Sequence, residues 1–174
     1  MSKQVYWFKL LAKCILYALL GTLISFAALG NEEVTGRVVS VIDGNTIEVA
    51  TPDNETYKII FHGIDCPEID QEFGEKAKRV LEKLILEKNV SVQFQGKDRW
   101  GNRLAIVLID GEIDPRVELL EQGLAWTSER NPIVELEAVR EKAKEKGKGL
   151  WKEENPTPPW IFRRQQTMLQ PKSS

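Results

Sequence analysis

Two short segments in the first half of the chain hold the residues best suited to chemistry. The first reads Asp43-Gly44-Asn45-Thr46 and the second reads Asp65-Cys66-Pro67-Glu68. Carboxylate and carbonyl oxygens are the ligands that a hard cation prefers, and a carboxylate can also orient or activate water. Glu68 has a plainer alternative, because an acid in this position often caps the following turn or helix. We expect Cys66 to be a small buried residue and not a nucleophile.

A third segment combines positive charge with an aromatic side chain. Its candidate nucleic-acid-binding residues are Lys97, Arg99, Trp100 and Arg103, and Arg163 and Arg164 near the end of the chain are further basic candidates. Proteins that grip single-stranded DNA or RNA use basic grooves with aromatic side chains. The alternative is that Trp100 packs as a plug in its loop while the arginines pair with nearby acids.

The composition is that of a globular protein of one domain. The chain has 174 residues, of which 42% are hydrophobic and 29% are charged, and this excludes a mainly disordered or fibrous chain. The net charge is −2, but the first thirty residues carry three lysines and no acid, so residues 31–174 have a net charge of −5. That acidity counts against strong non-specific binding to nucleic acid without excluding a local basic groove.

Residues 1–30 are predicted to be a signal peptide or an N-terminal membrane anchor. Three lysines precede an uncharged run from Cys14 to Gly30, which is the order of a secretory signal. The run is slightly shorter than the roughly 20 residues that span a bilayer, which favours cleavage. Either way we expect an exported domain (periplasmic, secreted or membrane-anchored facing outward) with transient or permanent membrane association at its N-terminus. After cleavage Cys66 would be the single cysteine, so no disulfide framework is expected.

The remaining sequence predicts a strand-rich domain over residues 31–153. Alternation and turn residues predict strands at 36–43, 46–50, 57–64, 89–95 and 103–111, and helical spacing predicts helices at 73–85, 115–126 and 134–151. This order fits an α+β, mainly β fold, a five-stranded OB-fold barrel with three helices. Residues 154–174 form a Pro-rich C-terminal tail that is expected to be extended.

Taken together, the motifs resemble the staphylococcal-nuclease-like, or thermonuclease, family from about Val34 to Trp151. The segments that carry the resemblance, in order, are residues 43–46, 63–68, Phe73-Gly74 with Ala77, 98–105, 121–125 and 149–151. The resemblance implies an OB-fold barrel and Ca²⁺-dependent cleavage of DNA and RNA. It also implies a calcium site at Asp65 and a general base at Glu68.

Three positions depart from the family pattern. Asn45 stands where the family has a calcium-binding aspartate, so any Ca²⁺ site is weakened, although Asp43 is still present beside it. Ile60 and Asn102 stand where the family has its two phosphate-binding arginines. Arg103 is next to Asn102, but adjacent residues of a strand point to opposite faces. Losing one such electrostatic contact costs on the order of 10²–10³ in rate.

These departures favour an exported thermonuclease-like domain that binds nucleic acid or a protein and has lost most or all of its phosphodiesterase activity. The alternative is an active Ca²⁺-dependent endonuclease with an altered site. In that case Lys58, His62 or Arg103 would take over the missing positive charge.

Overall fold

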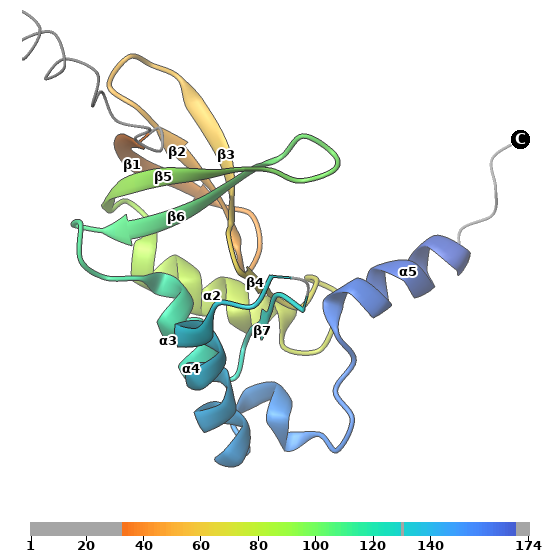
Figure 1. Ribbon diagram of the computed structural model, residues 1–174. Coiled ribbons are helices and arrows are strands. Elements are labelled where there is room, and N and C mark those ends of the chain that lie inside the picture. The colour runs from red at the N-terminus through yellow and green to blue at the C-terminus, as the bar shows by residue number, and fades with distance from the viewer. Residues whose placement is uncertain (1–32, 130, 170–174) are drawn as a thin grey trace, which may run out of the picture. The chain divides into compact units, whose positions relative to one another are not determined.

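The computed structural model describes residues 33–129 and 131–169 (Figure 1). The predicted signal peptide or anchor, residues 1–30, lies outside this part of the chain. Within the described residues, no helix has the length and apolar character needed to cross a membrane.

Five strands form a closed barrel, as predicted. They are β1 (Glu33–Val41), β2 (Thr46–Ala50), β3 (Thr56–Phe61), β5 (Asn89–Lys97) and β6 (Arg103–Ile109), and their order around the barrel is β1-β2-β3-β6-β5. Neighbouring strands are antiparallel except β3 and β6, which are parallel. This is the arrangement of an OB-fold. Two short strands, β4 (Ile64–Asp65) and β7 (Trp126–Thr127), pair with each other outside the barrel.

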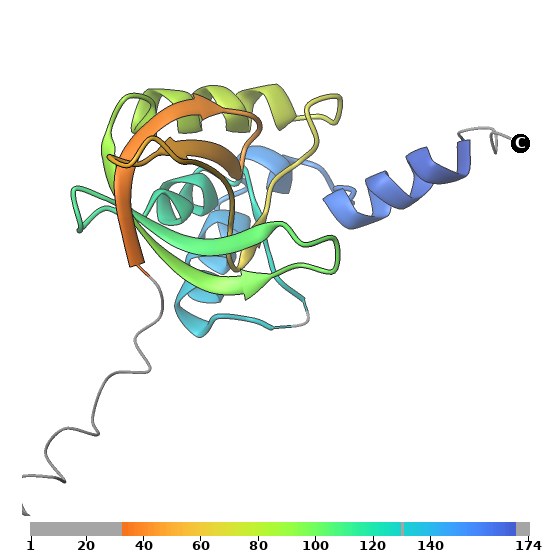
Figure 2. The same cartoon turned by 90° about the horizontal axis from the view of Figure 1, so that it is seen from above.

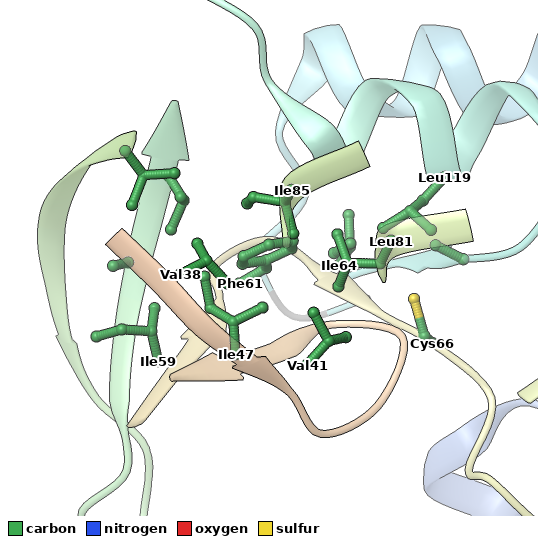
Figure 3. Close-up of a cluster of buried hydrophobic side chains, with 14 of the residues drawn as sticks. Val38, Val41, Ile47, Ile59, Phe61, Ile64, Cys66, Leu81, Ile85 and Leu119 are labelled. Carbon is green, nitrogen blue, oxygen red and sulfur yellow. The ribbon is translucent and has the colours of Figure 1, made fainter. Parts of the chain in front are cut away.

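The core fills the barrel and continues onto the helices beside it. In β3 the side chains alternate, so that Ile59 and Phe61 are fully buried while Ile60 lies half-buried on the other face. Leu81 and Ile85 of α2 (Gly74–Ile85) belong to the same buried cluster as Phe61, and Figure 3 shows Ile85 beside Phe61. Burial of each such side chain contributes about 1.5–3 kcal/mol, so this cluster fixes α2 at the end of the barrel.

A helix lies in each of the three predicted regions, but the second and third end earlier than predicted: Trp126 lies in β7 and Trp151 lies in a 3₁₀ turn. The expected extended tail is wrong. Besides α2, the structure has α3 (Pro115–Glu121), α4 (Val134–Glu145), a 3₁₀ turn η1 (Gly149–Lys152) and α5 (Pro159–Leu169). Figures 1 and 2 show α5 as a separate helix that follows the loop after η1. Proline is favoured in the first turn of a helix, and the prolines that suggested an extended tail end at the start of α5.

Two glycines hold the acidic segments against α2. A Cβ at Gly44 would lie 2.6 Å from Cys66 Cβ and 2.8 Å from Ala77 Cβ, and a Cβ at Gly74 would lie 1.7 Å from the carbonyl oxygen of Glu68. Any side chain at these positions would push the backbone apart. The turn around Gly44 and the loop that carries Glu68 are therefore placed by close backbone packing.

Candidate functional site

Asp65 and Glu68 are held together by an arginine from the far end of the chain. Arg163 Nη1 donates to Asp65 Oδ1 at 3.1 Å and to Glu68 Oε1 at 2.7 Å, and Nη2 donates to Asp65 Oδ2 at 2.7 Å. The Asp65 and Glu68 side chains are 24% and 35% exposed. Glu68 therefore does not serve as a simple helix cap: it shares one guanidinium with Asp65.

Burial and this ion pair act in opposite directions on Asp65. Burial raises the pKa of the Asp65 carboxyl and the nearby charge of Asp43 adds to it, while the hydrogen bond and charge of Arg163 lower it; the net shift is upward. The hydrogen bond to Asp65 raises the pKa of Arg163, which stays charged at any accessible pH.

Helix α5 is anchored beside Asp65 by contacts other than the ion pair. Trp126 is the register partner of Asp65 in the β4–β7 pair, and its ring meets the Trp160 ring edge-on with centroids 5.6 Å apart. Gln71 Nε2 donates to the Thr157 carbonyl at 2.6 Å, and Gln71 Oε1 accepts from the backbone N–H of Glu68 at 3.2 Å. The Gln71 side chain thus forms hydrogen bonds with both the segment before α5 and the loop that carries Glu68.

Asn45 is a buried structural residue. It is 9% exposed, and its Oδ1 accepts a hydrogen bond from the backbone N–H of Cys66 at 3.1 Å. Its own N–H donates to Asp43 Oδ1 at 2.9 Å, which closes the turn. The Asn45 amide oxygen carries no net charge and already accepts one hydrogen bond, so it is a weaker cation ligand than an aspartate carboxylate. Cys66 is buried as predicted, and burial raises the pKa of its thiol.

The two positions of the missing arginines also have local structural roles. Ile60 pairs in register with Thr46 of β2 and with Leu104 of β6. Asn102 Nδ2 donates to Asp98 Oδ2 at 2.8 Å, and its backbone N–H donates to Asp98 Oδ1 at 2.9 Å. Neither side chain supplies a positive charge.

The basic and aromatic candidates lie on the hairpin formed by β5, β6 and the loop between them. We call Lys97, Arg99, Trp100 and Arg103 the hairpin surface. Trp100 is 68% exposed, and the Arg99 guanidinium stacks 3.9 Å from the centre of its ring. The alternative that Trp100 is a loop plug is therefore wrong. Among the described residues, neither Arg99 nor Arg103 forms an ion pair with an acid.

The Arg103 guanidinium lies over two aromatic rings. Its guanidinium lies 4.3 Å from the Tyr57 ring centre and 5.3 Å from that of Phe94, and both rings pack against the core. Arg103 has the same alternation as the buried residues Ala105, Val107 and Ile109, so it starts the inward-facing side of β6. It also lines an open groove of about 460 Å³ together with Tyr57 and Lys58.

His62 directly follows β3 and is half-buried. Burial, together with the charge of Arg116, lowers its pKa below the ordinary 6.5. Arg116 is 6% exposed, pairs with Asp114, and donates to the His62 carbonyl at 2.7 Å. Nothing in the sequence pattern indicated this contact, because Arg116 and His62 are far apart in the chain. His62 is not positioned to replace a phosphate-binding arginine with a fixed charge.

This environment predicts that the free energy of unfolding falls as the pH drops below about 6.5. There the unfolded chain binds a proton at His62 that the folded chain resists, so the histidine contribution is complete above the unfolded pKa and is lost toward the lower folded value. Urea unfolding at a series of pH values measures it, with His62→Gln as the comparison. Because the chain has one histidine, its ring NMR signal also gives the folded pKa directly; a value above 6.5 would contradict the prediction.

The closed barrel and the carboxylate pair beside it define an OB-fold domain of the nuclease type. The chain belongs to the family described as staphylococcal nuclease homologue, whose model matches residues 58–153. A Haemophilus influenzae protein named an uncharacterized endonuclease is 38% identical over 157 residues, covering 88% of this chain and 86% of that protein. A protein of the same name from Escherichia coli O157:H7 is 33% identical over 75% of this chain and 86% of its own length. A Shigella flexneri protein named micrococcal nuclease is 27% identical, covering 74% and 80% respectively.

Members of this family are generally calcium-dependent, but the residues present here do not fit a calcium ion. Both oxygens of Asp65 and Oε1 of Glu68 accept hydrogen bonds from Arg163, whose positive charge would repel a divalent cation at this pair. The Asn45 oxygen carries no charge and accepts a hydrogen bond from Cys66. The part of the chain that the structure describes holds no group of three or more His, Cys, Asp or Glu arranged for a metal.

Proposed function

We propose that this domain binds single-stranded DNA or RNA at the hairpin surface and hydrolyses phosphodiester bonds slowly or not at all. The observation that carries the proposal is the exposed Trp100 ring with Arg99 stacked on it. A stacked aromatic and guanidinium offer a base a flat surface and a phosphate a positive charge.

The groove next to this surface supports the same partner. Tyr57, Lys58 and Arg103 line it together with one acid, Glu55, and its volume of about 460 Å³ lies within the range of ordinary binding pockets. Arg103 is fixed by the two rings beneath it, so less side-chain entropy is lost when it binds a phosphate. A local basic groove of this kind is compatible with the net charge of −5 of residues 31–174.

Weak or absent hydrolysis is supported by the side chains at the family's catalytic positions. Ile60 and Asn102 cannot stabilise negative charge on phosphoryl oxygens as guanidinium groups do. The surviving acids, Asp65 and Glu68, are both bonded to Arg163.

An active endonuclease is the second candidate, because the chain keeps Asp65 and Glu68 and its relatives are named endonucleases. Export of the domain by residues 1–30 stays a prediction from the sequence.

Salt dependence tests the binding proposal. We expect the full chain to bind labelled single-stranded DNA in EDTA with an affinity that falls as salt rises, with a slope of about −0.7 in the log–log plot for each phosphate contacted. Fluorescence anisotropy gives the slope, and Arg99→Gln should reduce it by about one contact. Arg79→Gln, an exposed arginine of α2, is the matched control. A slope near zero would rule out nucleic acid as the partner.

A further inference from the structure

The Asp65–Glu68 pair holds a cation that belongs to the chain itself. We infer that the Arg163 guanidinium is the resident cation of this site, so that the folded protein keeps the site closed to divalent metal ions. The inference concerns metal binding and deepens the proposed lack of hydrolysis, but its test contains no nucleic acid, so it can fail while binding at the hairpin surface still holds.

The geometry of Arg163 is that of a bridging ion. One nitrogen, Nη1, contacts an oxygen of each carboxylate, and Nη2 completes a two-point contact with Asp65. A guanidinium matches a carboxylate in this two-point manner and remains charged at all accessible pH values. The arrangement therefore neutralises two neighbouring, partly buried acids without a metal.

The charge balance agrees with this role. Three carboxylates around one divalent ion would leave one net negative charge. Here Asn45 replaces one carboxylate, and Asp65 and Glu68 share one monovalent guanidinium, which leaves one net negative charge on this pair, with the charge of Asp43 nearby. The single charge of Arg163 thus suits a site in which position 45 is an uncharged asparagine.

The anchoring of α5 makes this contact intramolecular and persistent. Trp160 and Arg163 are three residues apart, on one face of α5, and contact Trp126 and its register partner Asp65. The Gln71–Thr157 hydrogen bond holds the preceding segment. A metal ion would have to displace an arginine whose effective concentration at the site is set by these contacts.

Tb³⁺ luminescence tests the inference, because Tb³⁺ binds oxygen sites of the calcium type and Trp126 lies beside Asp65 to sensitise it. We expect no sensitised signal from the full wild-type chain with micromolar Tb³⁺, and none from Arg164→Gln, the exposed neighbour of Arg163 on α5. Arg163→Gln should give a signal that Ca²⁺ competes away. Adding Asn45→Asp should tighten Tb³⁺ binding by about tenfold or more, and adding Glu68→Gln to Arg163→Gln should abolish it.

Two results would overturn the inference: wild-type binding as tight as that of Arg163→Gln, or no binding by the folded Arg163→Gln/Asn45→Asp variant. If the Arg163 variants do not fold, the wild-type chain still decides the question. Its Arg163 Nε–Hε NMR signal should keep its position in millimolar Ca²⁺. Movement of that signal toward the position of a free arginine would show that calcium displaces Arg163.

Discussion

A variant with Asn45→Asp, Ile60→Arg, Asn102→Arg and Arg163→Gln is expected to cleave single-stranded DNA in Ca²⁺ at least about 10²–10³ times faster than the parent chain. Each restored guanidinium supplies a fixed positive charge where negative charge develops on the phosphoryl oxygens, and one such contact alone is worth on the order of 10²–10³ in rate. The Arg163 substitution is included because this side chain is bonded to both surviving acids. Initial rates on a fluorophore–quencher oligonucleotide measure the gain.

The matched comparison keeps Arg163 and changes its neighbour. The same three reversions combined with Arg164→Gln should give a smaller gain, because the Asp65–Glu68 pair remains bonded to Arg163. Asn102→Arg removes the hydrogen bond from Asn102 Nδ2 to Asp98, so each variant needs its melting temperature measured. If the four-site variant is folded, binds DNA and is as inert as the parent, then the positions named as the cause of inactivity are wrong.

Removing the Trp100 ring is expected to weaken binding of single-stranded DNA by about 5- to 150-fold in Trp100→Ala, the equivalent of about 1–3 kcal/mol for one stacked base. The ring is 68% exposed, so its loss should leave the free energy of unfolding almost unchanged. Because no charge is removed, the salt slope should also stay the same. Anisotropy titrations at several salt concentrations separate these effects.

Two further variants define the cause of that loss. Trp100→Phe keeps an aromatic face and should retain most of the affinity. Ile113→Ala removes another exposed apolar side chain, 53% exposed, beyond the other end of β6, and should leave binding unchanged. Equal affinity of Trp100→Ala and the parent chain would show that the Trp100 ring does not bind single-stranded DNA.

The strands of the barrel could be predicted from the sequence because each strand shows its own alternation of apolar and polar residues over a short segment. Alternation in segments such as Thr46–Ala50 gave the second strand with its observed bounds, and the helical spacing after Phe73 located α2 to within one residue. The site motifs were similarly local, since Asp65 and Glu68 are three residues apart. Periodicity and short motifs therefore suffice for the fold and for the identity of the candidate acids.

The occupant of the acid pair could not be predicted in this way. Arg163 lies 98 residues after Asp65, and it reaches the site only because α5 packs through Trp160 onto Trp126. The Pro-rich sequence before α5 suggested an extended tail and hid this helix. The one available signal was the spacing of Trp160 and Arg163, which places an aromatic and a basic side chain on one helical face.

The same limit applies to the altered positions. The sequence identifies Asn45 and Asn102 as substitutions, but their hydrogen bonds to Cys66 and Asp98 depend on turn geometry. These bonds show that each replacement also serves the local structure. Reversion therefore changes both the charge of the site and the turn that carries it.

Cleavage by the wild-type chain distinguishes a nearly inactive domain from an active endonuclease. The full chain is incubated with end-labelled single-stranded DNA and RNA in Ca²⁺ or in EDTA, and the products are separated on a denaturing gel, with Glu68→Ala prepared in parallel. We expect intact strands in every lane, with no difference between wild type and Glu68→Ala. Robust cleavage by the wild type in Ca²⁺ that is absent in EDTA and absent in Glu68→Ala would contradict it and establish an active endonuclease.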